Sequence, residues 1–259
     1  MAGFLFHEVV FGPVRSRRLG LSLGINLLPL HSKFCSFNCI YCECGWTPNP
    51  KEKPPELPTR EEVRWYLEKH LKRLQEEDYL PDTITYAGNG EPTVHPDFPA
   101  IVDDTLSLRD TYAPEACVTV LSNASMLHHK EIFQALLRLD NNIQKLDTGI
   151  EKIFRLVNNP MQPVNFEELI LNLKRFQGNV IIQTMFLRGE FRGEQFDNTK
   201  ESEVSAWLEK LNEIGPKSVM IYPIARATAS HNIEKIATFE LEKIAERVRK
   251  DGIEVEVYQ

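Results

Sequence analysis

The order of strands and helices along the chain predicts an α/β fold, a partial (β/α)6 barrel of parallel strands with helices outside. Short runs rich in β-branched residues alternate with stretches of helical periodicity. Six such strand–helix units precede one further strand, which is too few for an eight-fold barrel. Right-handed crossovers place the site at the carboxyl ends of the strands. The chain has 259 residues, 42% of them hydrophobic, and no linker or repeat, so we expect one domain over residues 1–259.

The predicted elements follow in order from the N-terminus. Residues 1–22 are an N-terminal extension with an apolar run, a Gly-Pro turn and the basic residues Arg15, Arg17 and Arg18. These arginines are either a solvated turn or a site for a carboxylate or phosphate, because a guanidinium binds oxyanions in two-pronged geometry. The strands are predicted over residues 23–30, 82–87, 116–121, 143–150, 180–187, 218–224 and 253–258. The helices are predicted over residues 60–77, 97–108, 127–139, 166–176, 204–214 and 239–250.

The stretch FCSFNCIYCECG, residues 34–45, carries three cysteines in the spacing C-x3-C-x2-C: Cys35, Cys39 and Cys42. Thiolates brought close by a short loop suit a soft metal or an iron–sulfur cluster. A four-iron cluster held by three thiolates keeps one iron open for another ligand, as catalytic zinc sites keep one position open. The alternatives are a closed site completed by Cys44, a disulfide, and chance clustering. We interpret residues 31–58 as a cluster-binding loop followed by a proline-rich connection.

Composition narrows the class of protein. The formal net charge of −7 argues against a nucleic-acid binder with a broad basic surface. No apolar run reaches membrane-spanning length, and residues 1–10 have no signal-peptide pattern. Four of the five cysteines lie within ten residues, which is typical of a metal site in a reducing compartment. We therefore expect a cytoplasmic protein with no membrane association.

The turn GNGEP follows the second predicted strand. Gly88 and Gly90 allow close backbone approach or a positive φ, and Pro92 restricts the exit. Such a turn at a strand end can direct backbone amides and carbonyls at a small polar ligand, although glycine turns after strands are also common without a ligand. Its place, after the strand that neighbours the cysteine loop, predicts that it faces the same site.

The arrangement C-x3-C-x-aromatic-C, with Tyr41 before Cys42, resembles the signature of the radical S-adenosylmethionine (radical SAM) superfamily. Members carry a Gly-Gly-Glu motif after the second strand, which Gly90 and Glu91 match while Asn89 replaces the first glycine. The phrase FGPVRSRRLGLSLG also resembles the opening of an iron–sulfur oxidoreductase subgroup that is distantly similar to the wyosine-forming tRNA enzymes. The resemblance covers essentially the whole chain and implies a single radical SAM domain with the partial barrel described above.

The resemblance also implies cofactors and partners. Cys35, Cys39 and Cys42 would bind a [4Fe-4S] cluster, Tyr41 would lie near the adenine of S-adenosylmethionine (SAM), and residues 88–91 would shape its methionine pocket. A flavodoxin or ferredoxin would reduce the cluster, and SAM would be cleaved to methionine and a 5′-deoxyadenosyl radical that abstracts hydrogen from the substrate. That substrate is unidentified: a small molecule, a peptide or protein, and a tRNA all stay open.

Polar residues at other predicted strand ends are further candidates for cofactor binding. Ser122 and Asn123 follow the third strand, and Asp147 lies in the fourth, where it could bind ribose hydroxyls or form a turn before Gly149. Arg188 and Arg226 could bind carboxylates or make ordinary ion pairs.

A second hypothesis, from a different class of function, is compatible with the same sequence. The chain could be a non-catalytic iron–sulfur electron-transfer protein, or a metal-binding protein that uses four cysteines as a closed site. The two readings differ at Cys44, which only the closed site requires.

Overall fold

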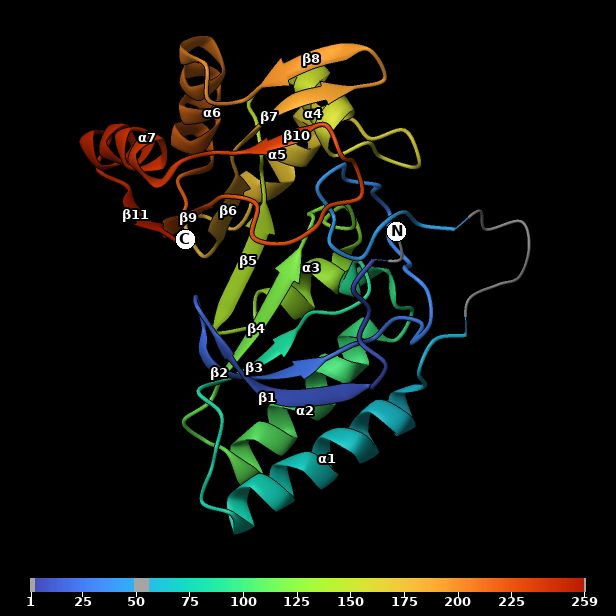
Figure 1. Ribbon diagram of the computed structural model, residues 1–259. Helices are drawn as coiled ribbons and strands as arrows, with labels where there is room; N and C mark the ends of the chain where they lie inside the picture. Colours follow the sequence, from blue (N-terminus) through green and yellow to red (C-terminus); the bar gives the residue numbers. More distant parts are fainter. Residues whose placement is uncertain (1–2, 49–55, 259) are drawn as a thin grey trace.

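Eight strands form one continuous sheet in the order β1–β2–β3–β4–β5–β6–β9–β11 (Figure 1). The computed structural model describes residues 3–48 and 56–258, so residues 49–55 of the predicted proline-rich connection lie outside it. All neighbours in the sheet are parallel except β1 and β2, which form an antiparallel hairpin. The strands are β1 (Val10–Ser16), β2 (Gly20–Ile25), β3 (Thr83–Tyr86), β4 (Cys117–Ser122), β5 (Asn141–Lys145), β6 (Ile181–Met185), β9 (Ser218–Tyr222) and β11 (Glu254–Val257). The predicted α/β class and the six parallel strands of the partial barrel, β2 to β6 with β9, are confirmed.

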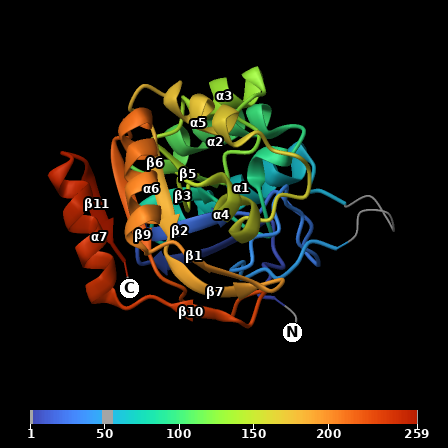
Figure 2. The same cartoon turned by 90° about the horizontal axis from the view of Figure 1, so that it is seen from above.

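The helices follow the outer side of the curved sheet from α1 round to α7 (Figure 2). They are α1 (Arg60–Glu76), α2 (Phe98–Tyr112), α3 (Lys130–Leu136), α4 (Glu151–Val157), α5 (Phe166–Lys174), α6 (Glu201–Ile214) and α7 (Thr238–Lys250), with a 3-10 turn at Pro92–Val94. The predicted capping box of α1 is present, since the Thr59 side chain accepts from the Glu62 amide at 3.2 Å and the Glu62 carboxylate accepts from the Thr59 amide at 2.8 Å. No helix among the described residues is long and apolar enough to cross a membrane.

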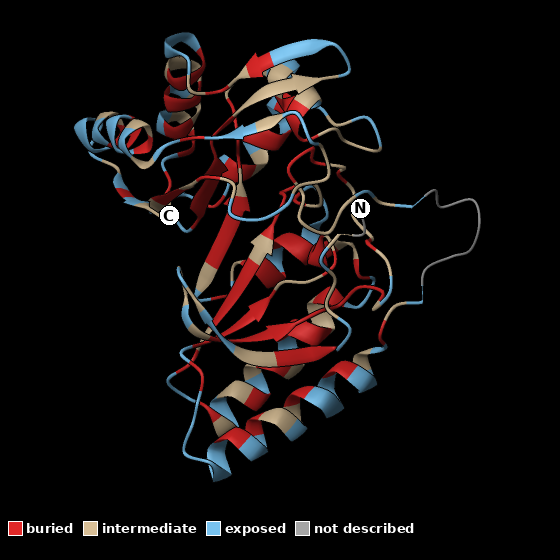
Figure 3. Ribbon diagram, in the orientation of Figure 1, coloured by how far each residue is buried: buried red, intermediate tan, exposed pale blue. Residues whose placement is uncertain are grey.

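The apolar core lies between the helices and the sheet, where Figure 3 shows buried strands behind helices that are exposed on their outer faces. Helix α1 buries Val63, Leu67, Leu71 and Leu74 of the apolar stripe that its periodicity predicts, whereas Tyr66, the fifth residue of that stripe, is exposed. The concave side of the sheet is more polar. There the Ser22 and Thr85 hydroxyls lie 2.9 Å apart, and those of Thr83 and Thr119 also lie 2.9 Å apart.

Several predicted strands end earlier than expected. The strand predicted over 23–30 ends at Ile25, and the one predicted over 143–150 ends at Lys145. After Ile25 the backbone bonds to a side chain, since the Leu28 amide donates to Asn26 Oδ1 at 3.2 Å. A buried loop can have the apolar composition of a strand without its inter-strand hydrogen bonds. Composition alone therefore overestimated the lengths of both strands.

A small second sheet was not predicted from the sequence. It has the order β10–β7–β8, with β7 (Leu187–Phe191), β8 (Glu194–Asp197) and β10 (Ile233–Lys235) all antiparallel. These strands are short and half exposed, so their pattern resembles that of loops. The segment leading into β10 runs over the cysteine loop, where the Ala229 and Ser230 amides donate to Cys42 O and Ile40 O at 3.1 and 2.8 Å.

Candidate active site

A cavity of about 220 Å³ lies at the carboxyl ends of the parallel strands. Most of the predicted site residues meet here, although they come from three separate segments of the chain. Its lining includes Cys35, Cys39, Tyr41, Cys42, Cys44, Gly88, Gly90, Glu91, Ser122, Asn123, Lys33, Lys145 and Gln183. Two predicted residues, Asn89 and Asp147, are buried beside the cavity and do not line it.

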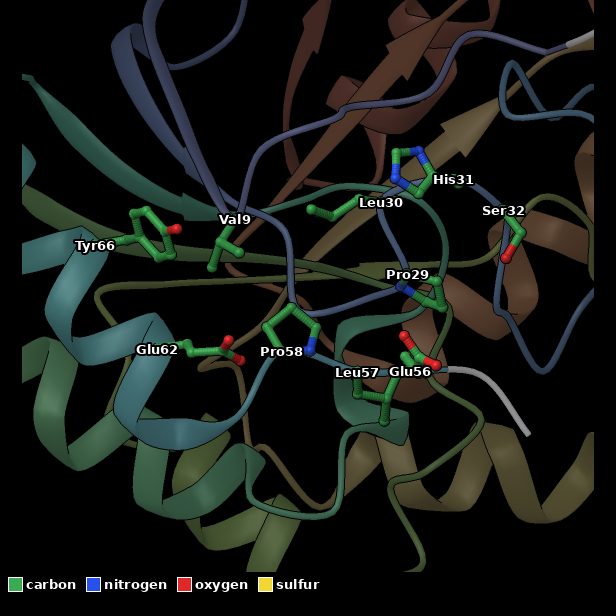
Figure 4. A pocket seen from close by; sticks show the side chains of 10 residues that line it. All are labelled: Val9, Pro29, Leu30, His31, Ser32, Glu56, Leu57, Pro58, Glu62 and Tyr66. Atoms are coloured by element: carbon green, nitrogen blue, oxygen red, sulfur yellow. The ribbon is translucent and has the colours of Figure 1, made fainter. Parts of the chain in front are cut away.

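A larger cavity, of about 620 Å³, is lined in part by residues 29–32, which lead into the cysteine loop (Figure 4). Its walls combine apolar residues such as Val9 and Leu57 with the side chains of His31, Glu56 and Glu62. It contains no thiol, and it does not share a lining residue with the cysteine cavity. We therefore place the chemistry in the smaller cavity.

Backbone hydrogen bonds to several other parts of the chain hold the cysteine loop. The Phe34 amide donates to Asn89 O at 2.9 Å, and the Glu91 amide donates to Phe34 O at 3.3 Å. On its far side the loop receives the Ala229 and Ser230 amides described above. A third contact comes from residues after α4, where the Asn38 amide donates to Asn159 O at 3.0 Å. The loop is therefore fixed in place although it has no regular secondary structure.

Lys33 places a positive charge beside the cysteine thiols of the cavity, and it was not predicted from the sequence. It is only 3% exposed, and its ammonium donates to Gly45 O at 3.1 Å. Burial alone would lower the pKa of Lys33, but its charge interactions with Cys42, Cys35 and Cys39 raise the pKa above its ordinary value. Lys33 can thus offset the negative charge that these three cysteines would concentrate here as cluster ligands. In the sequence, its position two residues before Cys35 is what could have indicated that Lys33 lies near the thiols.

The thiols differ in their readiness to ionise. The pKa of Cys42 is lowered to about 6, because the Cys44 thiol donates a hydrogen bond to it and Lys33 lies close, against the opposing effect of burial. Burial raises the pKa of Cys35 to about 12 and also raises that of Cys39. The pKa of Cys44 is raised because its proton is held in the bond to Cys42. Cys42 is therefore the thiolate, and Cys44 its donor, before any metal binds.

This difference predicts the alkylation pattern of the metal-free protein. Iodoacetamide should modify Cys42 with a half-maximal rate near pH 6, while Cys35 stays unmodified at neutral pH. The variant Cys44→Ala should move the Cys42 midpoint upward, because the hydrogen bond that lowers its pKa is lost. Mass spectrometry of peptides after timed alkylation between pH 5 and 9 measures both midpoints. Equal midpoints in the two proteins would contradict the assignment of Cys44 as donor.

The glycine turn fits against the cysteine loop. Gly90 has a φ of +146°, and a Cβ there would lie 1.9 Å from Phe34 O, so only glycine is accommodated. The Asn89 side chain points away from the cavity: its Nδ2 donates to Phe6 O and Pro29 O, and its Oδ1 accepts from the Phe6 amide, all at 2.8 Å. The structure therefore places Asn89 as a tie to the N-terminal segment.

Glu91 shapes the wall next to this turn. It is 2% exposed, and its carboxylate accepts from the Asn123 amide at 2.6 Å and the Thr93 amide at 3.1 Å. Burial raises the pKa of Glu91, against these hydrogen bonds that lower it. Asn123 in turn donates to Ser36 Oγ at 2.9 Å and to Cys35 Sγ at 3.6 Å. Glu91 and Asn123 thus connect the glycine turn, the end of β4 and the cysteine loop.

Asp147 anchors Tyr41 from behind the cavity. The Tyr41 hydroxyl donates to the Asp147 carboxylate, which also accepts from Asn158 Nδ2 at 2.7 Å and from the Met185 amide at 2.8 Å. Burial raises the pKa of Tyr41 and keeps the donating proton on its oxygen. Lys145, which sequence reasoning did not select, lies 3.8 Å from Asp147 and 4.6 Å from the Tyr41 ring centroid.

Two arginines named from strand ends make ordinary ion pairs. Arg226 lies 2.9 Å from the Glu43 carboxylate, and Arg188 pairs with Glu240 and, at 3.7 Å, with Asp197. Neither lines the cysteine cavity. The ion-pair alternative therefore accounts for both.

The donor set fits an iron–sulfur cluster better than a single metal ion. Within residues 3–48 and 56–258, no three Cys, His, Asp or Glu side chains converge closely enough to hold one ion. Three thiols around one cavity, with a buried lysine beside them, instead match the soft, anionic ligands that iron–sulfur clusters take. Cys44 Sγ also lies 3.6 Å from Gly88 O. We therefore assign Cys35, Cys39 and Cys42 as the residues able to hold a cluster.

Comparison with known sequences identifies a family and several relatives. Residues 30–202 match the family described as the radical SAM superfamily. "GTPase Obg" of Brachyspira hyodysenteriae is 31% identical over 90% of this chain and 32% of its own length. UPF0026 protein MJ1312 of Methanocaldococcus jannaschii is 32% identical over 80% of this chain and 61% of its own length. A UPF0026 protein of Helicobacter pylori is 29% identical over 92% of this chain and 70% of its own. The chain thus spans about a third of the length of the Brachyspira relative and about three fifths of the length of the Methanocaldococcus relative.

Solved structures share the fold at low sequence identity. A radical SAM methyltransferase from Sphaerobacter thermophilus superposes with a TM-score of 0.68 at 14% identity, covering 92% of this chain and 65% of that one. TYW1 with a lysine-pyruvate adduct bound superposes with a TM-score of 0.65 at 14% identity, covering 89% of this chain and 73% of that one. At this identity the likeness concerns the fold alone.

Proposed function

This chain belongs to the radical SAM superfamily, and from that premise we propose that it holds a [4Fe-4S] cluster through Cys35, Cys39 and Cys42 and cleaves SAM reductively. The observation that carries the proposal is the convergence of these three thiols with the Gly90–Glu91 turn at one cavity. When bound, the reduced cluster would supply one electron to the sulfonium of SAM. The bond from sulfur to the ribose carbon would then break, leaving methionine and a 5′-deoxyadenosyl radical that would take a hydrogen atom from the substrate.

The chain's own residues position the reactants and exclude water. Lys33 offsets the charge of the thiolates, and the Glu91–Asn123 contact joins the glycine turn to the cysteine loop. Tyr41 is oriented by Asp147 at the cavity wall, where we propose that it lies beside the adenine. An electron donor of flavodoxin or ferredoxin type would complete the cycle.

The substrate stays open among a small molecule, a peptide or protein, and a tRNA. The relative named as a GTPase does not extend that list, because this sequence contains no G-x-x-x-x-G-K-[S/T] phosphate-binding motif. The likeness to TYW1 supports a partial barrel of this kind, and the net charge of −7 does not favour a broad tRNA surface.

The deciding experiment is an anaerobic assay of the full chain. The protein is reconstituted with iron and sulfide, reduced with dithionite and given SAM, and 5′-deoxyadenosine is measured by chromatography. The proposal expects 5′-deoxyadenosine from the wild type, and an electron-spin spectrum that changes when SAM is added. A cluster that assembles but neither cleaves nor responds to SAM would support the non-catalytic electron-transfer function.

Cys44 distinguishes the open cluster from the closed four-cysteine site. Cys44 lines the cavity beside Cys42, which is the one observation that favours a closed site. An open cluster keeps its iron in Cys44→Ala, whereas a four-thiolate site loses it. Iron content and the absorption spectrum of this variant therefore test the second function independently of SAM.

A further inference from the structure

The turn between β1 and β2 reaches across the open side of the partial barrel. β1 ends one side of the sheet, and β9 lies near the other. In Figure 1 this turn, in dark blue, ends close to β9 and the C-terminus. Leu19 packs against Ile143, Ile181 and Met220, the apolar floor of the barrel interior. Arg18 beside it stacks on the Tyr222 ring of β9, with its guanidinium carbon 4.9 Å from the ring centroid.

Tyr222 connects Arg18 to two side chains that line the cysteine cavity. Its hydroxyl donates to Gln183 Oε1 at 3.2 Å and accepts a hydrogen bond from the Lys145 ammonium. Gln183 and Lys145 both line the cavity that holds the thiols. The polar group of Arg18, Gln183, Lys145 and Tyr222 therefore opens toward the place where the proposed chemistry occurs.

Two hydrogen-bond donors in this group have no partner. Gln183 is 5% exposed, and its Nε2 is buried without an acceptor among the described residues. Arg18 Nη1 is also buried without an acceptor among the described residues. Buried donors in native proteins are nearly always paired with protein, water or ligand, so two orphans around one tyrosine indicate something that these residues receive.

The charges of the group are also unbalanced. Lys145 has Asp147 at 3.8 Å as its counter-charge. Arg18 has no carboxylate within ion-pair distance in the described part of the chain, although it is half-buried. Arg15 and Arg17, which precede it in the same hairpin, are exposed. Of the three arginines, Arg18 alone combines burial with a free donor.

We propose that Arg18 and Gln183, arranged around Tyr222, form a subsite that binds an oxyanion of the substrate, a carboxylate or a phosphate, at the floor of the barrel. An oxyanion supplies both the negative charge that Arg18 lacks and acceptors for the two free donors. The assignment to substrate rests on the proposed function, because it places the anchored molecule in the cavity that contains the thiols. The subsite narrows the substrate class to molecules that carry such a group.

The first test uses inorganic phosphate and acetate as probes on the reconstituted full chain, with ionic strength held constant by chloride. The unfolding midpoint, followed by circular dichroism, should rise saturably with at least one probe. The variants Arg18→Met and Gln183→Leu should weaken that probe at least tenfold. Arg17→Met removes an equal charge from the exposed neighbour and should leave the affinity unchanged. Absence of saturable binding in the wild type, or an equal loss in Arg17→Met and Arg18→Met, would overturn the subsite.

The second test separates the substrate from SAM, whose methionine moiety also carries a carboxylate. SAM is titrated into the wild type in the presence and absence of saturating probe, and into Arg18→Met. Independent binding of SAM and probe, with the SAM dissociation constant of Arg18→Met changed less than twofold, supports a substrate subsite. Mutual exclusion would assign the anion to SAM and overturn the substrate assignment. The probe titration needs no SAM cleavage, so the subsite and the proposed function fail separately.

Discussion

Replacing Cys39 by alanine should leave a folded protein that no longer retains iron or forms 5′-deoxyadenosine. Cys39 is 8% exposed and lies between the other two ligands in the loop, so a three-thiolate site has no substitute for it. Removing a metal ligand should weaken binding by more than the roughly 10–100-fold typical of outer-shell losses. Iron content, visible absorption and the SAM assay after reconstitution measure the effect.

The chain supplies two matched controls for this change. Cys117 lies in β4, outside the loop, and Cys44 borders the cavity with its Sγ 3.6 Å from Gly88 O. Cys117→Ala and Cys44→Ala should both keep their iron. Far-UV circular dichroism should be the same in all three variants, which separates loss of the cluster from loss of the fold. Iron retained by Cys39→Ala would show that the cluster has another set of ligands.

Replacing Gly90 by alanine should have the second-largest effect, on stability and cluster binding together. The new Cβ would meet Phe34 O at 1.9 Å in a backbone conformation with φ of +146°, so the cysteine loop or the turn has to move. Strained backbone of this kind costs about 1–3 kcal/mol before the clash is counted. We expect the free energy of unfolding to fall by more than about 3 kcal/mol, which lowers the unfolding midpoint by roughly 6–12 °C at this chain length.

Gly252 provides the control for positive φ without a clash. Its φ is +79°, and a Cβ there would meet nothing within 4 Å. Gly252→Ala should cost only about 1–2 kcal/mol of backbone strain and leave iron binding unchanged. Chemical denaturation of both variants without metal measures the difference. Equal destabilisation would mean that backbone conformation alone, and not contact with the cysteine loop, restricts Gly90.

The order of the parallel strands was predictable because each buried strand is a short β-branched run followed by an amphipathic helix. The cysteines and Glu91 were found because their spacing follows local rules that survive without knowledge of the fold. Lys33 and Lys145 were missed, since a lone lysine acquires meaning only from the thiols or tyrosines that surround it in space. No local sequence pattern could have shown that these thiols and tyrosines lie next to the two lysines.

Two candidates were selected correctly as polar strand-end residues, but their side chains do not face the cavity. Asn89 bonds to Phe6 and Pro29, and Asp147 bonds to Tyr41 and Asn158. Phe6 lies more than eighty residues from Asn89 in sequence, and Asn158 follows the unpredicted helix α4. Which way a strand-end side chain turns depends on such distant partners, which a one-dimensional pattern does not contain.

The segment at residues 229–230 that bonds to the cysteine loop has a consequence for biosynthesis. Cys42 and its hydrogen-bonding partner Ala229 lie about 190 residues apart, so a ribosome adding about 5–20 residues per second completes this contact on the order of 10–40 s after the thiols emerge. During that interval the cysteines lack one of the backbone anchors that hold their loop. Iron delivered before residues 229–230 are made would meet an incompletely held loop, so cluster insertion should follow the synthesis of this segment.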